Sequence, residues 1–132
     1  MLTLDEAKEY FGRDRYATEV TGIEILEVGE HYAKCMLKLD SRHKNATGNV
    51  MGGVMFTLAD FVFAISTNTK EVVTVTTVSQ ISYLGAPKGE VLYGESHLLK
   101  DGRRTCFYEI LITDNLGNAV AKVAVNGTHV KC

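Results

Sequence analysis

The sequence has little proline, no tryptophan and no paired cysteines. Pro87 is its only proline, and three cysteines, Cys35, Cys106 and Cys132, stand far apart among 132 residues. Scattered cysteines without a Cys-x-x-Cys spacing favour neither a disulfide framework nor a zinc site. We therefore expect reduced thiols, a cytoplasmic protein and no metal. Cys35 and Cys106 lie in apolar alternating runs and are expected in the core.

Excess charge and long apolar runs are also missing. The formal net charge is -2, which gives no electrostatic case for nucleic acid or an anionic membrane as a partner. The first eight residues lack the basic and apolar segments of a signal peptide. The strongly apolar run 50–65 contains Asp60 and is too short to span a bilayer. The length predicts one domain, residues 1–132, with its own core.

The spacing of apolar residues predicts the order α-β-β-α-β-β-β-β. The expected elements are a helix over 3–11 begun by a capping box of Thr3 and Glu6, strands over 19–28 and 31–40, a helix over 52–69, and strands over 72–83, 91–100, 104–113 and 119–130. The second helix is apolar on all sides and must be buried, which a single curled antiparallel sheet achieves. The unpaired end strand of that sheet predicts a homodimer with one continuous sheet.

Asp60 is the one acidic residue in the apolar helix. Burying an ionised carboxylate is unfavourable unless it is paired or hydrogen-bonded. Thr57, Asp60, Ala64 and Thr67 follow helical spacing and form a narrow stripe without bulky apolar side chains. Either Asp60 faces a small polar cavity as a general base or nucleophile, or the stripe is exposed or bonded to a neighbouring strand.

The pair Gly52-Gly53 opens the same helix. Its backbone N–H groups, unblocked at the positive end of the helix dipole, suit a developing oxyanion, although a tight entry into the helix explains the pair equally well. Asp60 lies about 12 Å further along the helix axis. One substrate carbonyl cannot easily bridge that distance within one subunit, so a site shared between two subunits is favoured.

His43 and the pair Arg103-Arg104 are two further candidates for a role in the site. His43 stands in a polar loop, where a solvated side chain is favoured over a catalytic one. Arg103-Arg104 follows a turn and is either a solvated pair or a clamp for phosphate.

Residues 43–60 contain the pattern Asn-x-x-Gly-x-x-x-Gly-Gly-x₆-Asp. This pattern resembles the signature of the hotdog-fold acyl-CoA thioesterases of the phenylacetate-degradation (PaaI-like) type, and the element order from 19 to 130 matches that α+β fold. The resemblance implies that Asp60 is the base or nucleophile, that the Gly52 amide polarises the thioester carbonyl and that Asn45 helps to hold the carbonyl or water. It also implies a water-orienting hydroxyl at Thr76, or at the neighbouring Thr77. Asp60 and Thr76 of one subunit would then face Asn45 and Gly52 of the other.

The sequence departs from the family at Met51, where many relatives carry histidine before the two glycines. Methionine cannot donate a hydrogen bond, so the rate and the substrate choice are affected, while the Gly52 amide remains. The expected substrate is a small, medium or aromatic acyl-CoA; coenzyme A belongs to the substrate, and no further cofactor is expected. Expected substrate contacts are Met51, Gly53, Thr77, Lys88, Arg103 and Arg104, the basic residues lying near the phosphates. The expected assembly is a homodimer that pairs into a homotetramer. The alternatives are a hotdog hydratase or dehydratase and a non-catalytic acyl-CoA-binding domain.

Overall fold

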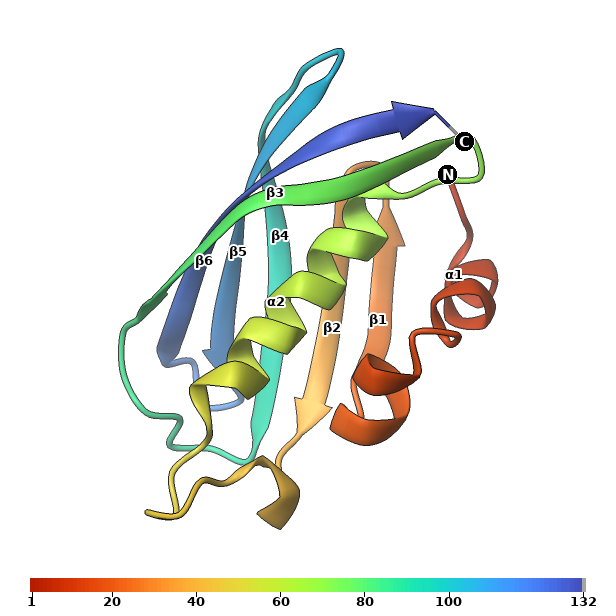
Figure 1. Ribbon diagram of the computed structural model, residues 1–132. Helices are drawn as coiled ribbons and strands as arrows, with labels where there is room; N and C mark the ends of the chain where they lie inside the picture. Colours follow the sequence, from red (N-terminus) through yellow and green to blue (C-terminus); the bar gives the residue numbers. More distant parts are fainter. Residues whose placement is uncertain (132) are drawn as a thin grey trace.

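The chain wraps one antiparallel sheet around one long helix. A computed structural model describes residues 1–131, so Cys132 lies outside the described residues. Helix α2 (Gly52–Thr67) crosses the concave face of the sheet, and α1 (Leu4–Phe11) lies beside β1 (Figure 1). This is the helix-in-sheet architecture expected from the sequence.

The sheet has six strands in the order β1-β2-β4-β5-β6-β3, with antiparallel pairing of neighbours. Strands β1 and β3 are therefore its two edges. The strands are β1 (Glu24–Gly29), β2 (Tyr32–Lys38), β3 (Val72–Tyr83), β4 (Val91–Asp101), β5 (Thr105–Asp114) and β6 (Ala119–Lys131). The predicted strands after residue 70 agree with these bounds to within one residue.

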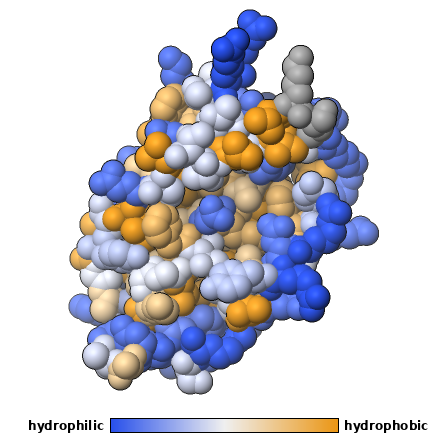
Figure 2. Space-filling view, viewed as in Figure 1, coloured by the Kyte–Doolittle hydropathy of each residue, from blue (hydrophilic) through white to orange (hydrophobic). Residues whose placement is uncertain are grey.

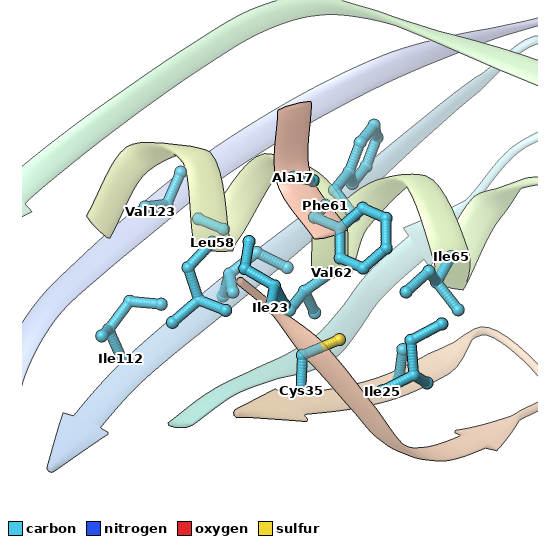
Figure 3. Packing of buried hydrophobic residues seen from close by; sticks show 14 of the residues in the cluster. Ala17, Ile23, Ile25, Cys35, Leu58, Phe61, Val62, Ile65, Ile112 and Val123 are labelled. Carbon is cyan, nitrogen blue, oxygen red and sulfur yellow. The ribbon is translucent and has the colours of Figure 1, made fainter. Parts of the chain in front are cut away.

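Helix α2 is the centre of the apolar core (Figure 3). Leu58 and Val62 are fully buried, and a Cβ placed on Gly94 of β4 would approach them within 3.0–3.1 Å, so this strand needs glycine to lie against the helix. Cys35 and Cys106 are fully buried thiols, as predicted. Within residues 1–131, no helix is long and apolar enough to cross a membrane.

The N-terminal third differs from the prediction in two places. The smaller difference is a short 3-10 helix, η2 (Ser41–His43), in the expected polar loop. The expected strand over 19–28 begins only at Glu24, because Tyr16–Thr21 forms a turn of π-helix (η1). Gly22 ends this turn with a φ of 93°, and its N–H donates to the carbonyl of Ala17. That left-handed conformation interrupts extended backbone and is readily adopted only by glycine. The capping box of Thr3 and Glu6 at α1 is confirmed.

Candidate active site

Asp60 lies midway along α2, on the side that the sheet leaves uncovered. Its side chain is exposed at the edge of an open depression lined by Tyr16, Phe56, Thr57, Asp60 and Ser79. Figure 2, seen from this side, shows apolar and polar side chains mingled over α2 with hollowed surface between them. Asp60 is therefore reachable by a substrate. Of the two interpretations of the stripe, the exposed one holds at Asp60 in the single chain, while Thr67 at the end of the stripe is buried.

The carboxyl group of Asp60 has a raised pKa. Loss of hydration beside the helix is the larger cause, and the negative charge of Asp14 is the second. No hydrogen bond from another residue within 1–131 contributes to the shift. A carboxylate with a raised pKa and no protein partner is a stronger base than an ordinary surface aspartate, as general-base catalysis requires.

The hydroxyl group that shares the depression with Asp60 belongs to Ser79 of β3. Thr76 and Thr77 are exposed residues outside this depression. The register of β3 against β6 shifts between Thr76 and Val78, and the Thr77 hydroxyl donates to the carbonyl of Asn126 at 3.2 Å. The sequence did not point to Ser79, since the bulge changes which residues face the helix.

The start of α2 forms a second, separate depression. Met51 is the N-cap residue, but no side chain caps the helix, and the N–H groups of Gly52 and Gly53 have no acceptor within residues 1–131. The ring of Tyr83 lies over Gly52: an added Cβ there would be 2.6 Å from the tyrosine oxygen. The Met51 side chain is 57% exposed, and the space beside Gly53 is open. Free amides at a helix N-terminus are suited to bind an oxyanion.

Asn45 organises the loop before α2 through its side-chain oxygen. That oxygen accepts hydrogen bonds from the Thr47 N–H at 3.1 Å, the Thr47 hydroxyl at 2.8 Å and the Asn49 N–H at 3.0 Å. Because the oxygen is fully used, the amide NH₂ of the exposed Asn45 side chain is left to donate to a ligand.

His43 is a structural residue, which corrects the expectation of a solvated side chain. It is 2% exposed. One ring nitrogen accepts from the Asp40 N–H at 3.0 Å, and the other lies 2.7 Å from the carbonyl of Thr21 and donates to it. Both nitrogens are thus used in joining the loop to η1, and neither is available for proton transfer.

The three basic residues expected near phosphate do not meet in one chain. Lys88 stands in the loop after β3, where its N–H donates to Asp114 at 2.8 Å. Arg103 and Arg104 stand in the β4–β5 turn at the opposite end of the molecule (Figure 1). The turn lies near the C-terminal end of α2, and Arg103 lines a cavity there with residues 65–69.

The two depressions on α2 share no residue. The first contains Asp60, the second contains Gly52, and these residues are about 12 Å apart along the helix axis. The edge strand β3 runs past both and exposes apolar side chains, of which Val75 is 46%, Val78 56% and Tyr83 53% exposed. An exposed apolar edge strand is open to pairing with another chain.

Comparisons with known proteins show the family to which this fold belongs. A family model described as "Thioesterase superfamily" matches residues 47–121. A putative esterase of Archaeoglobus fulgidus is 28% identical over 89% of this chain and 77% of its own, and the acyl-coenzyme A thioesterase PaaI of Escherichia coli is 27% identical over 76% and 72%. The structure of a hypothetical thioesterase with coenzyme A from Streptococcus pneumoniae matches with a TM-score of 0.84 at 26% identity, covering 94% of this chain and 97% of that one.

Proposed function

The chain belongs to the thioesterase superfamily, and we infer that it is a thioester hydrolase that splits acyl-CoA into a carboxylic acid and coenzyme A. The observation that supports this most strongly is that one helix carries both a carboxylate without a protein partner, Asp60, and backbone N–H groups without an acceptor at its start. A base and an oxyanion site are the two components that hydrolysis of a thioester needs.

Two routes for the reaction fit the position of Asp60. In one, Asp60 takes a proton from water as the water oxygen attacks the thioester carbonyl carbon. In the other, a carboxylate oxygen of Asp60 attacks that carbon, and water then hydrolyses the resulting anhydride. In both, the Gly52 N–H stabilises the negative oxygen, the carbon–sulfur bond breaks, and the thiolate leaves and takes up a proton.

We propose that two copies of the chain build each site. Antiparallel pairing of two β3 edges centred on Ile81 would place Tyr83 of one copy opposite the partner's Ser79. The start of α2, beneath Tyr83, would thereby come next to the depression that contains the partner's Asp60. Such pairing removes the exposed apolar edge and closes the gap between base and oxyanion site.

The remaining residues take supporting roles in this proposal. The free NH₂ of Asn45 holds the carbonyl or the water, and a β3 hydroxyl orients the water. Ser79, which shares the depression with Asp60, is better placed for the latter role than Thr76. Met51, Gly53 and Thr77 contact the substrate around the helix start and the edge strand.

We also propose where the coenzyme A phosphates lie and how the copies assemble. Lys88 and the pair Arg103-Arg104 stand at opposite ends of one chain, so a single CoA meets both only if they come from different copies. The exposed β3 edge supports a homodimer, which we propose pairs into a tetramer. The free thiols of Cys35 and Cys106 support a cytoplasmic location.

A thiol-release assay over a panel of acyl-CoAs tests this function. We expect steady-state release of coenzyme A from at least one small, medium or aromatic acyl-CoA, and loss of release in Asp60→Asn. Binding of acyl-CoA without release would favour a non-catalytic binding domain. Hydration of an enoyl-CoA with the thioester left intact would identify a hydratase.

A further inference from the structure

The aromatic ring of Tyr83, the last residue of β3, covers the first residue of α2. A Cβ added to Gly52 would lie 2.6 Å from the tyrosine oxygen and 2.8 Å from Cζ. In a helix the Cα–Cβ bond tilts toward the N-terminus, so the phenol lies on the N-terminal side of Gly52. The unbound N–H groups of the first turn point in the same direction. The phenol oxygen and the Gly52 amide therefore face a common space.

The hydroxyl group of Tyr83 is available to a ligand. Its side chain is 53% exposed, it lines the depression at the start of α2, and its hydroxyl makes no hydrogen bond within residues 1–131. A phenol donates one hydrogen bond, whereas the thioether of Met51, the neighbouring N-cap residue, donates none. Tyr83 is thus the side-chain donor that the structure places over Gly52.

We propose that the Tyr83 hydroxyl is a second hydrogen-bond donor to the thioester oxygen, beside the Gly52 N–H. An oxygen that accepts from the Gly52 amide lies beyond the helix N-terminus, which is the space under the phenol. Tyr83 is in that case a catalytic residue, because it touches the atom on which negative charge develops. The proposal rests on the hydrolase function inferred above.

The variant Tyr83→Phe tests the proposal, because it keeps the ring over Gly52 and removes only the hydroxyl. Loss of one oxyanion donor lowers kcat by about 10²–10³-fold in other hydrolases, and we expect about 10–100-fold since the Gly52 amide remains. KM and the mass by light scattering should not change. Tyr93→Phe is the matched control: Tyr93 lies on β4, where Lys34 is 5.2 Å from its ring centroid, and its loss of a hydroxyl should leave kcat unchanged.

A second variant restores a donor by another route. In Tyr83→Phe combined with Met51→His, an imidazole N–H at the N-cap can donate into the same space, and we expect partial recovery of kcat. A wild-type kcat in Tyr83→Phe would overturn the proposal, as would a loss of kcat that accompanies dissociation of the assembly. If the wild-type chain releases no thiol from any acyl-CoA, the hydrolase function itself fails. An active wild type with an unaffected Tyr83→Phe refutes only the role of the tyrosine.

Discussion

At the scale of single residues, the proposed chemistry depends on the carboxylate of Asp60. The raised pKa means that the folded chain binds the Asp60 proton more tightly than the unfolded chain does. The ionised group therefore lowers stability at neutral pH, and a neutral side chain of the same size relieves that cost. We expect Asp60→Asn to lower turnover by at least about 10²-fold while its Tm stays equal to or above that of the wild type.

Steady-state thiol release and thermal unfolding of the same preparation check both parts. Near-normal turnover in Asp60→Asn would remove the residue from the mechanism. A lower Tm would show instead that Asp60 has a structural role.

Asp14 gives a prediction about pH. A base must be ionised, so kcat/KM should fall as pH decreases through the pKa of Asp60. Asp14→Asn removes the like charge that contributes to the raised pKa, and the acidic limb of the profile should move to lower pH, by less than about one unit. Asp5→Asn, in the exposed first turn of α1, should leave the limb in place. An unmoved limb in Asp14→Asn would mean that another group limits the rate at low pH.

Met51 tests what the residue before Gly52 contributes. If Tyr83 already supplies a donor, Met51→His should add little to turnover of a short acyl-CoA. If Met51 also lines an apolar pocket, the same change should weaken a long acyl-CoA, by about 1–3 kcal/mol at most. Kinetics with one short and one long substrate decide this. Unchanged constants for both substrates would mean that Met51 touches neither substrate nor transition state.

At the scale of elements, the proposed assembly depends on strand β3. Val78 is 56% exposed near the middle of this edge strand. In the β3 pairing centred on Ile81, residue 78 of one copy lies opposite residue 84 of the other, so Val78→Lys places a positive charge against the exposed, apolar Leu84 at both symmetry-related contacts. We expect dissociation to monomers, or at least a weakened assembly, with a matching loss of turnover. Light scattering and activity at several protein concentrations measure both.

Leu116→Lys is the control for that change. Leu116 is 65% exposed, in the turn between β5 and β6, away from the β3 edge. It should retain the wild-type mass and turnover. A fully active Val78→Lys monomer would contradict a site built from two copies.

The elements also show how far the sequence alone leads. Alternation and helical spacing predicted α2 and every strand from β3 onward, because long regular elements repeat their pattern many times. The π-turn of η1 was missed, since six residues are too few for a period and only Gly22 marks its end. Asp60, Gly52 and Asn45 were named as candidates from the sequence. Ser79 and Tyr83 were not, because a bulge and a ring lying over a glycine depend on packing between distant segments.

At the scale of the whole molecule, the central claim is that each site takes Asp60 from one copy and Gly52 with Asn45 from another. The variant Asn45→Asp keeps the side-chain oxygen that accepts three hydrogen bonds in the loop, removes the donating NH₂ and adds a negative charge near the oxyanion. We expect it to assemble normally and to be nearly inactive. Asp60→Asn is inactive for a different reason, because it lacks the base that the other copy contributes to the same site.

Co-assembly of these two inactive variants tests the claim most directly. In a mixed dimer, one of the two sites combines an intact Asp60 with the partner's intact Asn45. Random pairing of equal amounts should therefore restore about one quarter of the wild-type turnover in the whole mixture, and about one half in mixed dimers that are isolated through two different tags. Thiol release measures both. Each variant alone stays inactive. A mixture that remains as inactive as its components, while light scattering shows mixed dimers, would place Asp60 and Asn45 in the same copy and contradict the shared site.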